Sequence, residues 1–323
     1  MKTRYLIFLL LFVPGFAAIT PSSLLAAGYP DHRIQLVITA VAGAQADITG
    51  RMLAEEMGQI LGQKIIPNNK PGASTVLGTD FAVRSKKDGY TLLYTGSSAF
   101  VYAPNVNPEV VHYDPARDAE PLGVHWFLPT VVGVKADSPW KTFAQLVEYA
   151  KKNPGKLRVS SIGVGSSSHI QIEMLQSMTG IKLVHVPFEG GESVVTAVLG
   201  GHVELTVDGF SKLKPHMEAG TMRVLVIDPK RPENPQIPSL SELGYRESLP
   251  STWFAMWAPA GIPEEARRIL VPTIEKAVKL TKPRIEQLGG ICDYKSPAEQ
   301  RKLRDSEYRQ VYEIAVKAGL RKP

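Results

Sequence analysis

The chain has very little cysteine: Cys292 is the single one among 323 residues. One cysteine excludes an internal disulfide and a cysteine-based metal cluster. Because no paired histidine is evident, we expect Cys292 to be a small buried residue rather than a nucleophile. A histidine cluster and an H-E-x-x-H motif are missing as well, so the sequence predicts no metal centre. No cofactor is expected.

The chain also lacks a large excess of charge of one sign. The 37 Lys and Arg residues against 31 Asp and Glu give a net charge of +6. The basic residues are dispersed, whereas nucleic-acid-binding proteins gather them in a patch or stripe. We therefore expect no nucleic acid among the partners. A mild positive field favours small anionic ligands.

The common motifs of enzymes are absent or incomplete. The nucleophile elbow G-x-S-x-G does not occur. Gly163-Val164-Gly165 begins a G-x-G-x-x-G, but Ser168 stands at the third glycine position and no suitable acidic residue follows. Ser166 and His169 would share one helical turn without an orienting acid, which is poor geometry for a hydrolase. The sequence thus favours a protein that is not an enzyme; an exported hydrolase or lyase acting on a small carboxylate is the alternative.

Long apolar runs are missing except at the N-terminus. Two basic residues precede an apolar run at 6–18, and small residues follow it. This pattern predicts a secretory signal peptide, residues 1–28, cleaved near Ala26–Gly28. A membrane anchor is the other interpretation, but the run is shorter than the ~20 residues of a span and Pro14 interrupts it. We expect the mature chain to be a soluble periplasmic protein.

Short strand-like runs alternate with helical patterns along the rest of the chain. Strands are expected at 34–38, 64–66, 91–94, 130–134, 157–160, 203–207, 223–227 and 253–258. Such alternation predicts parallel sheets and an α/β fold. The length suggests two domains, and we expect them to comprise 29–128 with 249–323, and 129–248, linked by two crossings around a cleft. Residues 105–118 are expected to form a long surface connection, and 263–317 to be helical.

Several helix starts carry recognisable capping residues. The S/T-x-x-E/Q pattern predicts a capping box at each of four positions, Thr142, Ser168, Ser239 and Ser296. Asp47 is a plausible N-cap for a helix that ends at Leu61, before Gly62.

The most informative segment is the loop 160–169, Ser-Ser-Ile-Gly-Val-Gly-Ser-Ser-Ser-His, between a predicted strand and a predicted helix. The first N–H groups of a helix have no partner within it, and the helix dipole is positive there. Glycines let an anionic group approach the backbone, and serine hydroxyls add donors. The loop therefore predicts a site for a small anion such as a carboxylate.

Several candidate side chains have a structural interpretation beside the functional one. Asp47 and Asp208 either contact a ligand or cap a helix, and the cap is favoured for both. A helix cap needs one hydroxyl group, and Ser166 with the two serines after it offers three, so ligand contact is favoured there. His169 lies in the first helical turn, where a positive charge opposes the dipole, so we expect a neutral structural residue or a single donor to the ligand. Ser97 ends a strand, where α/β sheets place ligands, or lies in an ordinary turn.

Several short motifs follow one another in a definite order along the chain. They are Tyr29-Pro30, Lys87-Asp88-Gly89-Tyr90-Thr91-Leu92-Leu93, Tyr113-Asp114-Pro115, Ser161-x-Gly163-x-Gly165-Ser166-x-x-His169, His185-Val186-Pro187-Phe188-Glu189-Gly190-Gly191 and Ala258-Pro259-Ala260-Gly261-Ile262-Pro263. Each motif is weak alone. Together they resemble the periplasmic solute-binding receptors of tripartite tricarboxylate transporters, the Bug family, across nearly the whole mature chain.

The resemblance implies a type II periplasmic-binding-protein fold, with two Rossmann-like α/β domains, two crossing strands and a ligand cleft between. It also implies a receptor that captures a small organic acid, a di- or tricarboxylate or an aromatic acid, for a membrane permease. A ligand sensor acting with a membrane kinase is a further alternative, and we expect a monomer. Two loops act as jaws in such receptors, here 39–47 and 160–169. The expected ligand-binding residues are Ala42, Gly43, Ala44, Asp47, Ser97, Ser161, Gly163, Gly165, Ser166, His169, Phe188, Gly190 and Asp208.

The first jaw departs from the family pattern, in which Pro-Phe precedes the loop and a Gly-Gly pair lies inside it. Here these positions read Thr39-Ala40 and Gly43-Ala44. A methyl group would then face the ligand, and the missing phenyl ring would open space. We interpret this as a sign of an altered ligand rather than of lost binding.

Overall fold

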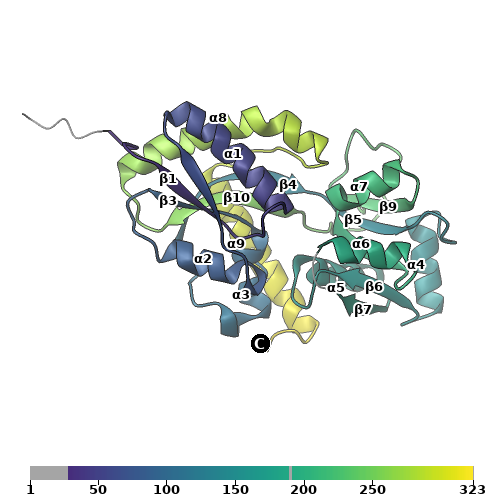
Figure 1. Cartoon of the computed structure of the whole chain (residues 1–323). Coiled ribbons are helices and arrows are strands. Elements are labelled where there is room, and N and C mark those ends of the chain that lie inside the picture. The colour runs from purple at the N-terminus through teal and green to yellow at the C-terminus, as the bar shows by residue number, and fades with distance from the viewer. Residues whose placement is uncertain (1–27, 189–190, 323) are drawn as a thin grey trace, which may run out of the picture.

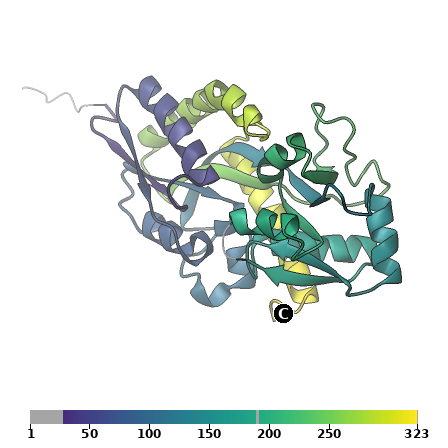
Figure 2. The same cartoon turned by 45° about the vertical axis from the view of Figure 1, so that its right-hand side comes forward.

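The computed structural model describes residues 28–188 and 191–322. The expected signal peptide up to residue 27, and Gly190, lie outside these residues. The described chain forms two five-stranded sheets, which define two lobes that lie side by side (Figure 1). The first lobe combines the N-terminal and C-terminal parts of the chain, and the second lobe is built from its middle part (Figure 2).

The sheet of the first lobe has the strand order β2-β1-β3-β10-β4. Its strands are β1 (Ile34–Ile38), β2 (Ile65–Asn69), β3 (Thr91–Gly96), β4 (Ala119–Leu128) and β10 (Thr252–Pro259). β1 is a continuous apolar run apart from Gln35 and is almost wholly buried, as expected for a parallel strand covered on both faces. β10 runs antiparallel to both of its neighbours, β3 and β4.

The sheet of the second lobe has the order β7-β6-β8-β5-β9. Its strands are β5 (Thr130–Lys135), β6 (Leu157–Ser161), β7 (Leu183–Pro187), β8 (Leu205–Gly209) and β9 (Met222–Asp228). Here β5 is the antiparallel strand. In each sheet the antiparallel strand is the one that follows a crossing between the lobes. The predicted α/β fold is confirmed, with one antiparallel strand per sheet that the alternation pattern does not predict.

Helices cover both sheets. Those of the first lobe are α1 (Gln45–Leu61), α2 (Val76–Val83), α3 (Ala103–Val106), α8 (Glu264–Gln287) and α9 (Pro297–Lys317). Those of the second lobe are α4 (Phe143–Lys152), α5 (Ser167–Thr179), α6 (Gly191–Leu199) and α7 (Phe210–Glu218). Three short 3₁₀ turns are η1 (Ala73–Thr75), η2 (Ser97–Ala99) and η3 (Pro108–Val110). α1 and α8 lie side by side on the outer face of the first lobe (Figure 1).

The sequence does not predict β4 or β7. β4 contains Pro121 and Gly123, residues that normally interrupt a strand. The residues predicted to be helical, 263–317, form two helices, the second of which starts after the predicted cap Ser296. Gly289, with a φ of 85°, follows the end of the first. The connection that follows then pairs with β4 through an isolated bridge between Ile291 and Phe127.

The prediction of a surface connection at 105–118 is wrong at its start and middle. Asn105 is fully buried, and its side-chain amide donates to the carbonyls of Val101 and Tyr308. Tyr113 is buried too, and its hydroxyl donates to the carbonyl of Ala99 at 2.5 Å. Both polar groups find backbone partners in the interior, which makes their burial possible.

The capping boxes predicted at Thr142 and Ser296 are confirmed at the starts of α4 and α9. At Ser239 the reciprocal hydrogen bonds with Glu242 also form. No helix follows them, because the turn closes at Gly244, whose φ is 84°. The hydrogen bonds of a capping box therefore stabilise a turn here, and no helix continues from it.

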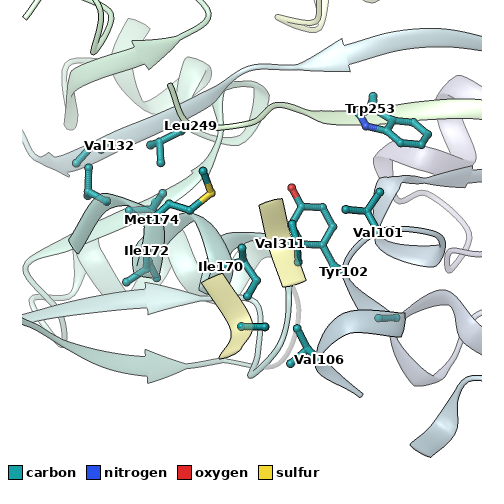
Figure 3. Close-up of a cluster of buried hydrophobic side chains, with 14 of the residues drawn as sticks. Val101, Tyr102, Val106, Val132, Ile170, Ile172, Met174, Leu249, Trp253 and Val311 are labelled. Atoms are coloured by element: carbon teal, nitrogen blue, oxygen red, sulfur yellow. The ribbon is translucent and has the colours of Figure 1, made fainter. Parts of the chain in front are cut away.

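A continuous apolar core joins the two lobes. Figure 3 shows side chains of both lobes meeting around α9, among them Val101, Tyr102, Val106, Ile170, Met174 and Val311. α9 packs on β4 and α3 of the first lobe and on α5 of the second. In the described part of the chain, no helix combines the length and the apolar character that crossing a bilayer requires.

Candidate ligand-binding site

Each lobe presents a loop that ends in the N-terminus of a helix. The first loop (39–47) leads from β1 into α1, and the second loop (160–169) leads from β6 into α5. Both loops turn at glycines with positive φ, 82° at Gly43, 127° at Gly163 and 74° at Gly165. A strand, a glycine turn and a helix start form the arrangement that binds anions in α/β proteins.

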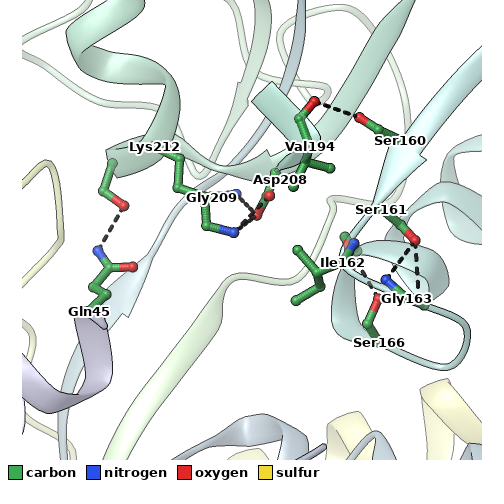
Figure 4. A network of polar contacts seen from close by, with 12 residues as sticks. Gln45, Ser160, Ser161, Ile162, Gly163, Ser166, Val194, Asp208, Gly209 and Lys212 are labelled. Atoms are coloured by element: carbon green, nitrogen blue, oxygen red, sulfur yellow. Dashed lines mark hydrogen bonds and ion pairs between the residues drawn. The ribbon is translucent and has the colours of Figure 1, made fainter. Parts of the chain in front are cut away.

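Both loops contact the opposite lobe. The side-chain nitrogen Nε2 of Gln45, the first residue of α1, donates to Oγ of Ser211 in α7 at 2.7 Å (Figure 4). From the other side, a Cβ added to Gly165 would lie 2.5 Å from a methyl carbon of Val106 in α3. The N-termini of α1 and α5 therefore lie where the two lobes meet.

Asp47 holds the first loop in place. Its carboxylate is buried and accepts hydrogen bonds from the N–H of Gly43 at 2.9 Å, Nε of Arg51 at 2.7 Å and Nδ2 of Asn69 at 2.8 Å. Burial alone would raise the pKa of Asp47, but these hydrogen bonds hold it below its usual value. The N-cap of α1 is Ala44, so the prediction of Asp47 as N-cap is wrong. Its carboxylate instead reaches back from the first helical turn to the loop.

The first loop keeps free donors before and within the first turn of α1. The amide of Gly43 is taken by Asp47, and that of Ala44 donates to the carbonyl of Val41 at 3.2 Å. Within the described chain, the loop amides that have no hydrogen-bond partner include those of Ala42, Gln45 and Ala46. Of the expected contacts in this loop, Ala42 therefore keeps an available N–H, while Gly43 and Ala44 do not.

Serine hydroxyls shape the second loop. Ser166 is the N-cap of α5: its hydroxyl accepts from the N–H of His169 at 3.2 Å and donates to the carbonyl of Gly163 at 2.7 Å. The capping box predicted at Ser168 is wrong, because the glycine turn places Ser166 at the cap. Ser168 Oγ instead accepts from the N–H of Ile162 at 3.1 Å.

Two stacked histidines support the second loop. The rings of His169 and His185 are nearly parallel, with centroids 3.9 Å apart. His169 Nδ1 accepts from the N–H of Gly165 at 3.0 Å, and His185 Nε2 lies 2.5 Å from Oγ of Ser161. Burial, with the neighbouring His185, lowers the pKa of His169 to about 4, and burial lowers that of His185. His169 is therefore neutral at neutral pH.

The second loop also keeps free donors at its helix end. The amides of Gly163 and Gly165 are engaged by side chains of the loop itself. Among the described residues, no partner exists for the amides of Val164, Ser167 and Ser168. The two loops thus each offer unpartnered N–H groups at the start of a helix, and these two helix starts lie at the same junction between the lobes.

The carboxylate of Asp208 already forms an ion pair with a lysine. It lies at the end of β8, and both of its oxygens are 2.8 Å from Nζ of Lys212 in α7 (Figure 4). One oxygen also accepts from the N–H of Gly209 at 2.7 Å. The N-cap of α7 is Gly209 and has no side-chain cap, so the interpretation of Asp208 as a cap is wrong.

The remaining candidates, Ser97 and Phe188, directly follow strands β3 and β7. Ser97 is fully buried at the end of β3, and within the described residues its hydroxyl has no hydrogen-bond partner. Phe188 packs against an apolar cluster of the second lobe, and its N–H donates to the carbonyl of Ser161 at 2.9 Å. In the ranges 28–188 and 191–322, no group of His, Cys, Asp or Glu side chains could hold a metal ion.

Sequence reasoning missed the side chains that connect the lobes. Gln45 and Ser211 are ordinary helix-surface residues in sequence, and nothing in the pattern indicates that they meet. The pairing of Lys212 with Asp208 could have been found from the spacing of four residues across the strand-to-helix junction. His185 appears in one of the motifs that resemble the receptor family, but its contact with Ser161 depends on the parallel pairing of β6 with β7.

The fold agrees with that of a known family. The model of the tripartite tricarboxylate transporter family receptor matches residues 49–294, more than half of the chain. The chain belongs to this receptor family. BugT of Bordetella pertussis is 30% identical over 261 residues, which are 80% of this chain and 79% of BugT.

Solved structures of similar receptors share the fold. The periplasmic binding protein BugD is 29% identical and covers 91% of this chain and 100% of its own, with a TM-score of 0.77. Rpa4515 of R. palustris, solved with adipate, is 26% identical and covers 90% and 98%, with a TM-score of 0.79. The two-domain receptor fold implied by the sequence motifs is confirmed.

Proposed function

We propose that this receptor captures a small organic acid in the periplasm and holds its carboxylate between the first and second loops. The observation that carries the proposal is the pair of helix N-termini, those of α1 and α5, with unpartnered amides at the same junction. Helix N-termini attract anions because their N–H groups are free and their dipoles are positive there. The adipate in the Rpa4515 structure supports a dicarboxylate as the first ligand to test.

The available donors suffice for useful affinity. A hydrogen bond to a charged group contributes about 1.5–3 kcal/mol. Micromolar binding corresponds to about 8 kcal/mol. Four or five amide–carboxylate bonds reach that value after the ordering of the ligand and loops has removed part of the gross sum. A metal ion is not needed for such a site.

We further propose that the lobes act as two hinged domains, 29–128 with 249–323, and 129–248. The crossings at Pro129 and before β10 would then absorb the rotation that closes the receptor on its ligand. Both loops would approach each other on closure, and the contact of Gln45 with Ser211, present in this structure, would help to hold the closed form. The closed receptor, as a monomer, would present its ligand to a membrane permease.

Binding without catalysis is the function that the side chains support. The pair of Ser161 and His185 has the reach of a nucleophile and base, but Ser161 is fully buried. In the described chain the nearest acid, Glu173, lies 3.8 Å from Nε2 of His169, and no ion pair involves His185, so an orienting acid is missing for His185. Nuclear magnetic resonance of adipate incubated with the purified protein should show no product over hours; a product would favour the hydrolase or lyase alternative.

A thermal-shift screen tests the proposed function. Organic acids, beginning with adipate, malate and benzoate, should be compared with their amides, which have the same shape without the charge. A ligand at 100 times its Kd stabilises a protein by about 2.7 kcal/mol, and a domain pair of this size responds with a rise in Tm of several degrees. We expect the rise with at least one acid and not with its amide. Equal responses to acid and amide, or no response across the acids, would contradict the proposal.

A further inference from the structure

A pocket of about 440 Å³ lies at the crossings between the lobes, away from the two loops. Its wall includes Phe127 at the end of β4, Pro229 directly after β9 and Ser251 directly before β10. Ile291, in the α8–α9 connection, and Leu303 of α9 complete the apolar part. No residue of the first or second loop lines it, so this hinge pocket is separate from the proposed carboxylate site.

Contacts around the hinge pocket fix its wall. Ile291 and Phe127 exchange two backbone hydrogen bonds, each of 2.8 Å. Arg231, two residues after Pro229, is buried, and its Nη1 donates to the carbonyls of Gly289 and Gly290 at 2.7 and 3.0 Å. The segment that leaves the second lobe is thus fastened to the α8–α9 connection beside the pocket.

The rim of the hinge pocket offers one available cation. Four charged residues line it, Asp293, Lys295, Glu299 and Lys302. Asp293 pairs with Lys295 at 2.6 Å. Glu299 accepts from the N–H and the hydroxyl of Ser296, and these bonds, with the charges of Lys295 and Lys302, lower the pKa of Glu299. Lys302 is exposed. Its charge acts on Glu299, but among the described residues no hydrogen bond or close ion pair fixes its ammonium group.

We propose that the hinge pocket is a second ligand site, for a small organic anion with an apolar body, such as an aromatic or medium-chain aliphatic acid. The apolar wall buries the body of the ligand, and the acid group pairs with Lys302 at the rim. A volume of about 440 Å³ falls in the range of roughly 300–1,000 Å³ that small-molecule sites occupy. Because the wall is made mainly of apolar side chains, a sugar or a polyol would leave its hydroxyl groups unpartnered there.

The fluorescent anion 1-anilinonaphthalene-8-sulfonate tests this site, because it combines an apolar body with one negative charge. We expect a saturable rise in its fluorescence with the mature chain, and displacement of the dye by octanoate. Ser251→Trp, which fills the hinge pocket, should abolish the saturable signal. Lys302→Glu should weaken the dye affinity at least fivefold. Ser241→Trp, an exposed position outside the pocket in the same connecting segment, is the matched control and should bind as the wild type does.

The two variants test the hinge pocket independently of each other. Lys302→Glu changes an exposed side chain, so it reports on the site even if Ser251→Trp were to impair folding, which circular dichroism would reveal. A saturable signal that survives unchanged in both variants overturns the proposal, as does the absence of a saturable signal in the wild type. The test does not depend on any ligand of the first and second loops, so its failure leaves the proposed receptor function untouched.

Discussion

The first and second loops build similar anion sites with different chemistry. The first loop is held by one buried carboxylate, Asp47, in the first turn of α1, with Arg51 and Asn69 as its partners. The second loop is held by serine hydroxyls and a neutral histidine, and α5 has no acidic residue in its first turn. A carboxylate at a helix N-terminus uses part of the positive potential that would otherwise attract a ligand. We therefore expect the carboxylate of the ligand to bind closer to α5 than to α1.

The largest effect should come from a glycine of the second loop. In Gly165→Ala the alanine must hold a positive φ, and its methyl group would lie 2.5 Å from a methyl carbon of Val106 in the opposite lobe. Strain of about 1–2 kcal/mol should lower the free energy of unfolding. Overpacking of about 1–3 kcal/mol between the lobes should lower ligand affinity by roughly 5-fold to 100-fold. Gly43→Ala is the matched variant in the first loop, since nothing lies within 4 Å of its Cβ. It should lose stability through the same strain and keep most of its ligand affinity. Isothermal titration calorimetry measures both affinities.

A second change separates steric overlap from backbone strain at Gly165. Adding Val106→Ala to Gly165→Ala removes the overlapping methyl group and should recover part of the lost affinity. Absence of any recovery would mean that the two lobes do not approach each other at this point when the ligand binds.

Asp47→Ala should be the most destabilising change in the first loop. It removes three hydrogen bonds to a buried carboxylate and leaves the N–H of Gly43 unpartnered. We expect a loss of about 3 kcal/mol of unfolding free energy, against about 1 kcal/mol for the loss of the helix cap in Ser166→Ala. Chemical denaturation provides both values. Equal losses would show that the two loops are held equally firmly.

The pH dependence of stability should distinguish the two loops. The pKa of His169 is lowered to about 4 in the folded chain, against about 6.5 in an unfolded one. Between these values only the unfolded chain binds the proton, so stability falls as the pH drops from about 6.5 to about 4, by at most about 3 kcal/mol. Asp47, whose pKa is lowered, stays ionised over this window. The fall in Tm should be smaller in His169→Asn, whose amide oxygen can accept from Gly165 without titrating; identical slopes would contradict the assignment.

The smallest effect should come from Gln45→Ala. It removes one neutral hydrogen bond between the lobes, that to Ser211, worth about 0.5–1.5 kcal/mol. We expect ligand affinity to fall about threefold to tenfold and the dissociation rate to rise. Ser211→Ala should have the same effect, and the double variant should add little to either one. Fully additive effects would mean that the two side chains act separately.

The fold was largely predictable, because alternating apolar runs and explicit caps specify most strands and helices independently of one another. β4 was not, because Pro121 and Gly123 are tolerated there through pairing with β10 and the α8–α9 connection, which is tertiary information. The position of Asn105 in the interior likewise depends on a carbonyl of α9, about 200 positions away in the chain.

The loops of the site could be located from sequence, but their internal hydrogen bonds could not. Serine and glycine spacing indicates an anion site at 160–169 whichever hydroxyl caps the helix. The choice of Ser166 over Ser168 depends on how the two glycines turn the backbone. In the first loop, the role of Asp47 depends on Asn69 at the end of β2, a neighbour that only the sheet order brings close.

The C-terminal helix α9 has a practical consequence for anyone who wishes to turn this receptor into a sensor. Because α9 packs on β4, α3 and α5 at once, it ties the two lobes together at one edge. Lys317 at its end reaches across to Ser177 of α5 at 2.7 Å. A dye pair on the outer tips of the lobes would then report only a small swing, whereas a single dye on the last turn of α9 would register the sliding of that helix against α5.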